Sequence, residues 1–298
     1  SVYSYDSTLN SPTLLIESSN ITTSILGADS NIDAYASGIY LSSDTTIFNS
    51  LTAFVQSSNI TAYSVEYANP FYLYAYGIWI DGKYSSNYDS ATFLVESSNV
   101  NLRVATLAQY HYGRATGLEL QRLNAIQNIN INISNSIITS NFGGFGVSGV
   151  NFDSVSSISH CTISVTSDIE GTEGDVRGIS FNHPLTLLNE SIITFDGSLK
   201  SQSEYTDYHG IFLTVDGSMP FVIGSTMIHC NVNATMPSGR MIGIEMSFNN
   251  DGGHGVLDNV TIVCEGWMCE NVENEECQSK GVQINRIDGP KAEIEMTN

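Results

Sequence analysis

Basic residues are scarce in this sequence. Its 298 residues include 10 lysines and arginines against 31 aspartates and glutamates, which gives a formal charge of -21. Such a negative surface repels nucleic acid and anionic lipid head groups, so we exclude both as partners. A solubilising coat, cation binding and contact with a basic partner surface remain compatible with this charge.

Long apolar runs and helical patterns are also lacking. No run approaches the roughly 18–20 apolar residues that cross a bilayer, so we expect no direct membrane span. Proline is rare, with six residues, whereas Ser, Asn, Thr, Tyr, Ile and Gly are abundant, and this favours strands and turns. The sequence starts at Ser1 without a visible signal peptide, so we expect a processed product or a fragment of a longer protein.

What the sequence does contain is a repeat. A glycine, a branched apolar residue, a variable residue and another apolar residue recur at intervals of 29 to 40 residues. The repeat glycines are Gly38, Gly77, Gly117, Gly149, Gly178, Gly210, Gly243 and Gly281. A second stretch, ESSNIT at 17–22, returns as QSSNIT at 56–61 and ESSNVN at 96–101. Periods of this length are typical of solenoids, in which each coil contacts only its neighbours.

The apolar positions of the repeat predict two interior columns, because residues two apart lie on one face of a strand. The first column comprises Ile39, Ile78, Leu118, Val150, Ile179, Ile211, Ile244 and Val282. The second comprises Leu41, Ile80, Leu120, Phe152, Phe181, Leu213, Met246 and Ile284. We expect each repeat glycine to occupy a corner at which a tight turn needs a positive φ.

We therefore predict an all-β solenoid of about eight coils of 29–40 residues with variable loops, forming a single domain over residues 1–298. A β-propeller is disfavoured because no Gly-His or tryptophan signature recurs from repeat to repeat, and a leucine-rich repeat because its Leu/Asn spacing is absent. The repeat resembles the right-handed parallel β-helix, or pectate-lyase-like, superfamily. That superfamily includes polysaccharide lyases and hydrolases, phage tailspikes, and adhesins and passengers of bacterial surfaces, so the fold alone does not decide the function.

One segment of the chain carries a possible catalytic motif. The Gly-His-Gly within NNDGGHG at 249–255 is similar to a motif of polygalacturonase-like glycoside hydrolases. The resemblance implies a site at Asp251 and His254, with Asp216 one coil earlier as a second carboxylate and Arg286 binding substrate, since glycoside hydrolysis needs two carboxyl groups. The chain departs from that family because it has no Asp-Asp pair and because Ile287-Asp288 follows Arg286. A glycine-rich connecting loop explains the same residues, so we lean towards no enzymatic activity.

Aromatic residues are dense near the second and third repeats. The candidate binding residues are Phe71, Tyr72, Tyr74, Trp79, Tyr84, Tyr110 and Tyr112. Aromatic side chains on neighbouring loops favour sugar or protein binding, but packing of the same residues against the coils is an equal alternative.

The five cysteines are an odd number, so at least one is unpaired. Cys230 and Cys264 end similar segments of adjacent coils and are expected to be buried thiols. Cys269 and Cys277 bracket an acidic loop and could form a disulfide in an oxidising compartment. We expect no metal and no cofactor, because no Cys-x-x-Cys pair is present and the acidic loop lacks the order of calcium-binding loops.

Six sequons permit N-glycosylation if the chain passes through a eukaryotic secretory pathway. They are at Asn20, Asn59, Asn132, Asn189, Asn233 and Asn259.

Three functions remain open from the sequence. The first is a non-catalytic, adhesin-like or structural β-solenoid that is extracellular or at the cell surface and binds a glycan or protein surface through its loops. The second is a carbohydrate-active enzyme, either a polygalacturonase-like hydrolase or a tailspike-type depolymerase, at the Asp251/His254 region. The third is an array subunit that self-associates through the ends of the solenoid, where unpaired strands can accept further strands.

Overall fold

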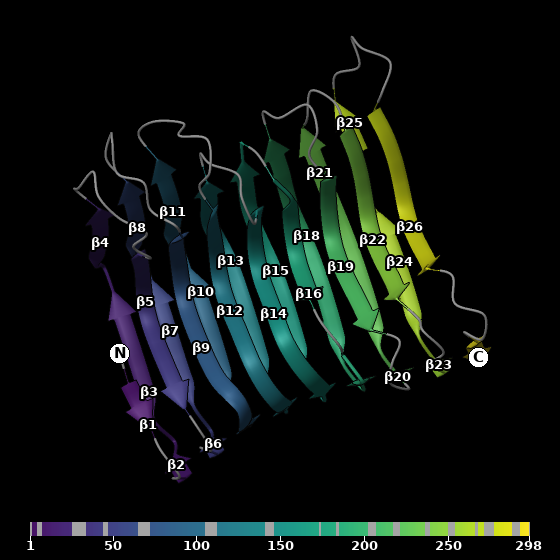
Figure 1. The fold of residues 1–298 in the computed structure, drawn as a ribbon, viewed down its shortest axis with the longest axis horizontal. Helices are drawn as coiled ribbons and strands as arrows, with labels where there is room; N and C mark the ends of the chain where they lie inside the picture. The colour runs from purple at the N-terminus through teal and green to yellow at the C-terminus, as the bar shows by residue number, and fades with distance from the viewer. Residues whose placement is uncertain are drawn as a thin grey trace.

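The structure, a computed structural model, describes residues 2–4, 8–25, 34–43, 47–64, 72–104, 112–140, 146–172, 174–182, 185–201, 207–216, 221–235, 239–249, 254–265, 268–270, 277–287 and 293–297. Its regular elements are all strands, and the strands are joined in parallel into two long sheets. Among the described residues there is no helix that could span a membrane. The chain is a right-handed parallel β-helix, as predicted, whose coils lie side by side along the longest axis (Figure 1).

The glycine repeats lie in the first sheet, which has 15 strands. Its main path runs β1 (Val2–Ser4), β5 (Ala34–Ser43), β9 (Tyr72–Asp89), β12 (Tyr112–Gln127), β14 (Gly146–Ser159), β16 (Val176–Asn182), β19 (Asp207–Asp216), β22 (Gly239–Asn249) and β26 (Cys277–Ile287). Short strands extend it around a corner: β2 (Thr8–Asn10), β6 (Ile47–Asn49), β17 (Leu187–Asn189), β20 (Phe221–Gly224), β23 (His254–Asp258) and β27 (Glu293–Thr297).

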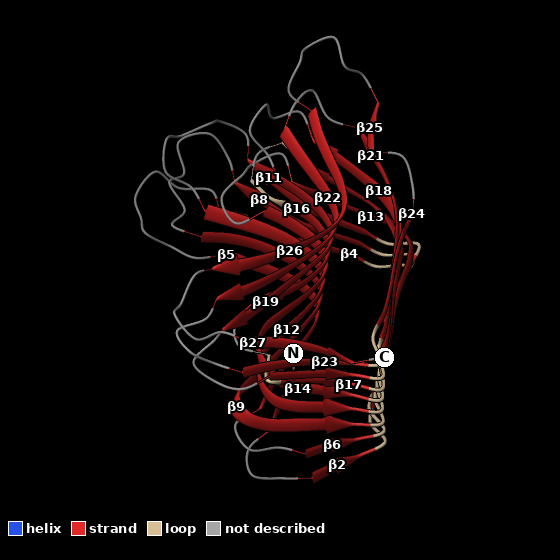
Figure 2. Cartoon of the chain, turned by 90° about the vertical axis from the view of Figure 1, so that its right-hand side faces the viewer, coloured by secondary structure: helices blue, strands red, loops and turns tan. Residues whose placement is uncertain are grey.

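The second sheet, of 12 strands, closes the other side of each coil (Figure 2). Its main path runs β3 (Thr13–Glu17), β7 (Thr52–Gln56), β10 (Thr92–Glu96), β13 (Asn130–Ser140), β15 (Thr162–Gly171), β18 (Ile192–Ser201), β21 (Met227–Thr235) and β24 (Thr261–Glu265). The remaining strands are β4 (Asn20–Ile25), β8 (Asn59–Ser64), β11 (Asn99–Val104) and β25 (Met268–Glu270).

Both predicted interior columns are confirmed by the strand register. Each residue of the first column pairs with the next along the solenoid, from Ile39 to Val282, and the second column does the same from Leu41 to Ile284. The described side chains of both columns are buried except Val282, which is 44% exposed in the last repeat strand. Within the second column the rings of Phe152 and Phe181 stack with their centroids 4.6 Å apart.

The expectation that the repeat glycines sit at corners with positive φ is wrong. They lie within the strands, and the only described glycines with positive φ are Gly146 and Gly174. The reason for glycine is instead a lack of space for a side chain. A Cβ at Gly38 would lie 2.6 Å from the Gly77 carbonyl oxygen and 2.8 Å from Ile60 Cδ1 of the facing sheet. The repeat needs glycine because the two sheets and the next coil approach closely there.

Serine takes the conformation that we expected of glycine. Ser50, Ser57, Ser90 and Ser97 have φ values of 49° to 55° at the corners on either side of β7 and β10. Left-handed conformations are uncommon outside glycine and are favoured by residues whose short polar side chain bonds to nearby backbone. The repeated ESSN stretch is therefore a one-residue corner that connects two strands of the second sheet.

Candidate functional site

The variable residue of the glycine repeat forms a column of its own on the outer face of the first sheet. The strand register aligns Tyr40, Trp79, Glu119, Asn151, Ser180, Phe212, Glu245 and Gln283 in this order. These residues alternate with the interior columns and therefore point away from the core. Glu119, Asn151, Ser180 and Glu245 are nonetheless buried, because neighbouring side chains of the same face cover them.

The first two repeats of this face carry an aromatic cluster, which we define as Tyr35, Tyr40, Tyr74, Tyr76 and Trp79. The ring of Tyr35 stacks on Tyr74 and on Trp79 with centroid distances of 5.0 and 5.2 Å. The indole also contacts Tyr40 at 4.3 Å and Tyr76 at 5.1 Å. Tyr35 is 41% exposed, so the cluster reaches the surface.

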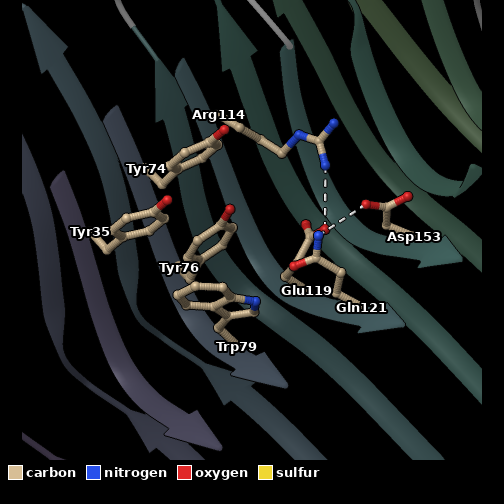
Figure 3. Close-up of a pocket in the computed structure, with 8 residues that line it drawn as sticks. All are labelled: Tyr35, Tyr74, Tyr76, Trp79, Arg114, Glu119, Gln121 and Asp153. Carbon is tan, nitrogen blue, oxygen red and sulfur yellow. Dashed lines mark hydrogen bonds and ion pairs between the residues drawn. The ribbon is translucent and has the colours of Figure 1, made fainter. Parts of the chain in front are cut away.

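A hollow of about 270 Å³ separates the aromatic cluster from polar residues of the next two coils (Figure 3). It is lined by Tyr35, Tyr74, Tyr76, Trp79, Arg114, Glu119, Gln121 and Asp153. A second hollow, of about 590 Å³, lies against the same cluster and is lined by Ile21, Thr23, Tyr35, Ser37, Gly38, Tyr40 and Trp79. The aromatic cluster therefore has open space on more than one side.

Two residues that line the first hollow each have a buried polar atom without a hydrogen-bond partner. The indole Nε1 of Trp79 is a buried donor without an acceptor, and Glu119 Oε2 is a buried acceptor without a donor of good geometry. In Figure 3 the indole nitrogen points to the side of the hollow where Glu119 and Gln121 lie. Buried polar groups in proteins are nearly always paired, so each such atom calls for an explanation.

The other oxygen of Glu119 has two partners. Asn151 Nδ2 donates to Oε1 at 2.7 Å, and Arg114 Nη1 donates to it at 3.3 Å. Across the hollow, Gln121 Nε2 donates to Asp153 Oδ2 at 3.3 Å. The two carboxylates thus come from adjacent coils, and the strand register places Asp153 beside Gln121.

Burial controls the protonation of the Glu119 carboxyl. It raises the pKa of Glu119 to about 7, against the opposing effects of Arg114 and of the hydrogen bond from Asn151. The Thr116 hydroxyl lies close enough to lower that pKa slightly, although its geometry falls short of a hydrogen bond. For Arg114, burial is the largest single effect and lowers the pKa, but the Glu119 carboxylate together with Tyr76, Asp153 and Tyr74 outweighs it, so the net shift is upward. The site therefore holds a carboxyl that changes charge near neutral pH.

Polar contacts continue along this face towards the C-terminal coils. Asn182 Nδ2 donates to Asn151 Oδ1 at 2.7 Å, and Arg177 Nη1 donates to Asn182 Oδ1 at 2.9 Å. The Arg177 guanidinium lies 4.1 Å from the ring centroid of Phe212, a cation–π contact.

Further along, His209 Nε2 lies 2.8 Å from Glu245 Oε2. Together with the preceding contacts, this pair forms a band of polar and aromatic side chains that runs from the second repeat to the seventh.

Of the predicted aromatic binding residues, the structure brings Tyr74 and Trp79 together in the aromatic cluster. Phe71 and Tyr110 lie outside the described residues. Tyr72, Tyr84 and Tyr112 have described backbone in β9 and β12, but their side chains lie outside the described set. The rings of Tyr74 and Trp79 pack against other rings and also line the hollow.

The residues of the alternative catalytic site fall largely outside what the structure describes. Asp251 is among the undescribed residues. Asp216 lies at the end of β19 and pairs with Asn249, His254 begins β23, and Arg286 lies in β26, but the side chains of all three are undescribed. The hypothesis of a site at these residues stays a prediction.

The structure describes the side chains of some predicted cysteine and sequon positions and not of others. Cys230 is buried as expected and Cys264 is half-buried, whereas the side chains of Cys269 and Cys277 lie outside the described set. Asn20, Asn233 and Asn259 are exposed, and Asn59, Asn132 and Asn189 are half-buried. Within the described ranges no group of three His, Cys, Asp or Glu side chains is arranged to hold a metal ion.

Sequence reasoning missed most of this site. It did not select Tyr35, Tyr40, Arg114, Glu119 or Asp153. The available signal was the variable position of the repeat itself, because a residue between two inward-pointing apolar positions must face outwards. Aligning the eight repeats at that position would have placed Trp79 beside Glu119.

Comparison with known proteins found no matching family model, no similar curated protein and no similar solved structure.

Proposed function

We propose that the protein is an extracellular or cell-surface β-solenoid, adhesin-like in character and related to the pectate-lyase-like β-helices, that binds glycans at the aromatic cluster and the adjoining hollow. The observation that carries the proposal is the hollow itself, whose lining combines aromatic rings with Trp79 and Glu119, two residues that each have a buried polar atom without a hydrogen-bond partner. A sugar presents apolar C–H faces to aromatic rings and hydroxyl groups that both donate and accept hydrogen bonds.

Charge supports a neutral or weakly basic glycan over an acidic one. The hollow contains one guanidinium, that of Arg114, against two carboxyl groups, those of Glu119 and Asp153. The guanidinium already donates to Glu119, so little positive charge is left for an anionic sugar. The overall charge of -21 adds a long-range repulsion of anions.

The proposal is tested by glycan-array binding and calorimetry with the full chain and with Trp79→Ala. We expect Trp79→Ala to weaken binding at least about tenfold, because the indole supplies an aromatic stacking surface at the hollow. Phe54→Ala is the matched control, since Phe54 is a half-buried aromatic on the second sheet and should leave binding unchanged. Equal affinities of Trp79→Ala and the unchanged chain would reject the site.

One observation favours glycoside hydrolysis as a second candidate. Glu119, with a pKa near 7, and Asp153 line the same hollow, and pairs of carboxyl groups in unlike environments are the usual arrangement for general acid catalysis at a glycosidic bond. The ion pair with Arg114 gives Glu119 a purely structural explanation. Release of reducing ends from a bound glycan by the unchanged chain, and its loss in both Glu119→Gln and Asp153→Asn, would establish hydrolysis, and binding without cleavage would exclude it.

A further inference from the structure

Two cysteines face each other in the last coils of the second sheet. β21 and β24 are parallel neighbours, and their register pairs Cys230 directly with Cys264. Both thiols are free, and each shifts the pKa of the other: Cys264 raises the pKa of Cys230, and Cys230 lowers that of Cys264. Neighbouring parallel strands lie about 4.8 Å apart, which falls within the Cα separation of about 4.4–6.8 Å that disulfides span.

The position of this pair in the core is unusual. The same interior column holds branched or aromatic residues in the preceding coils: Ile16, Val55, Val95, Ile133, Val165 and Phe195. Only at its C-terminal end do two cysteines follow one another. A small side chain suits Cys230, because its sulfur packs tightly against the Gly210 backbone, but this packing explains one cysteine and not its partner.

We propose that Cys230 and Cys264 are a site of oxidative cross-linking that ties β24 to the neighbouring strand β21 of the second sheet. Among the described strands, β24 pairs only with β21, so the bond would join it to its one described neighbour. A strand that is held on one side opens more readily than one held on both sides, and a covalent tie adds most there. One complete coil lies between the two cysteines, so the bond would also close that coil into a loop.

The chemistry is a thiol–disulfide exchange with a low-molecular-weight disulfide such as oxidised glutathione. Cys264 is half-buried and therefore the accessible sulfur, and the neighbouring Cys230 thiol lowers the pKa of its thiol. Its thiolate attacks the small disulfide, forms a mixed disulfide and releases one small thiolate. Cys230 then loses its proton and attacks the Cys264 sulfur, which releases the second small thiolate. The protein loses two hydrogen atoms, and the oxidant becomes two thiols.

The same assignment accounts for the odd number of cysteines. With Cys230 and Cys264 as one pair and the predicted Cys269–Cys277 bridge as another, Cys161 is the single cysteine left over. It is buried, and burial raises the pKa of its thiol to about 11, so it is a poor partner for exchange.

The test is oxidation of the reduced full chain in a glutathione redox buffer, followed by alkylation, proteolysis without reductant and mass spectrometry. We expect a linked peptide that joins Cys230 to Cys264 with the loss of two hydrogens, and a rise in Tm of about 5 °C over the reduced chain. Cys264→Ala should abolish the linked peptide and reduce the rise in Tm, whereas Cys161→Ala should retain both.

Peptide mapping of the unchanged chain detects the linkage directly, so the test remains decisive even if a variant folds poorly. Recovery of Cys230 and Cys264 in alkylated or glutathione-bound form would overturn the proposal. So would a link from Cys264 to Cys269 or Cys277, or a Cys230–Cys264 link that leaves the Tm unchanged.

Discussion

At the scale of single residues, the repeat glycines act by excluding a side chain. A Cβ at Gly117 would lie 2.7 Å from the Gly149 carbonyl oxygen and 2.8 Å from Ile133 Cδ1, and the space at Gly178 is tighter still. Backbone carbonyls of the next coil cannot move aside as a flexible side chain can. The glycine column is therefore a line of close contact between coils, and it brings the first sheet near enough to the second for the two to share one core.

A second residue-scale feature is the buried carboxyl of Glu119. Its pKa is 4.5 in the unfolded chain and about 7 in the folded protein, so between these two pH values the folded protein holds a proton that the unfolded chain has released. Stability contributed by this group is thus complete below pH 4.5 and is lost as the pH rises towards 7.

We predict that Glu119→Gln flattens the dependence of stability on pH between 5 and 8. The unchanged chain should lose on the order of 3 kcal/mol of unfolding free energy over this range, since each pKa unit corresponds to about 1.4 kcal/mol, and the variant should not show this loss. Urea unfolding at a series of pH values measures it. Glu17→Gln, at an exposed position, is the control and should keep the slope of the unchanged chain. An unaltered slope in Glu119→Gln would show that this carboxyl does not carry the raised pKa.

At the scale of the strand, the corners of the second sheet are held by a ladder of buried serines. The backbone N–H of Ser19 donates to Ser58 Oγ, that of Ser58 to Ser98 Oγ, and that of Ser98 to Ser136 Oγ, each at 3.2 Å. The Ser98 hydroxyl donates in turn to the Glu96 carbonyl at 2.9 Å. One hydroxyl therefore satisfies backbone groups of its own corner and of the neighbouring coil.

We predict that Ser98→Ala lowers the free energy of unfolding by about 1–3 kcal/mol, because it leaves the Ser58 N–H buried without a partner. Hydrogen exchange at the Ser58 amide should accelerate in the same variant. Ser164→Ala, on the outer face of β15, is the matched control and should change stability by less than about 0.5 kcal/mol. Equal stability of the two variants would mean that solvent or a neighbouring group replaces the lost acceptor.

The strand scale also shows how much of the fold the sequence predicts. Apolar residues at Ile78 and Ile80 fix the register, because a slip of one residue would turn both out of the core. The ESSN repeat reveals a corner, but not that Ser97 rather than a glycine takes the left-handed conformation. The sequence does not predict the site in the same way. Trp79, Glu119 and Asp153 cluster because their outward-facing positions stack, and the sequence reveals this stacking only once the register between coils is known.

At the scale of the whole molecule, the interior columns make the coils interdependent. A coil in the middle of the solenoid buries its column residues between two neighbours, whereas a coil at an end has a neighbour on one side only. The first column shows this within one residue type: Val150 is fully buried, and Val282, at the same repeat position, is 44% exposed. The two valines thus compare a contact between two repeat strands with a contact on one side only, because β26 pairs with β22 alone among the described strands.

We predict that Val150→Ala lowers the free energy of unfolding by about 2–3 kcal/mol, because it removes two buried methyl groups and leaves a cavity between the coils of β12 and β16. Val282→Ala, the matched change, should cost less than about 0.5 kcal/mol. Urea unfolding followed by circular dichroism gives both values. Comparable losses in the two variants would mean that the terminal coil is packed as tightly as the central ones and that burial along the column does not govern stability.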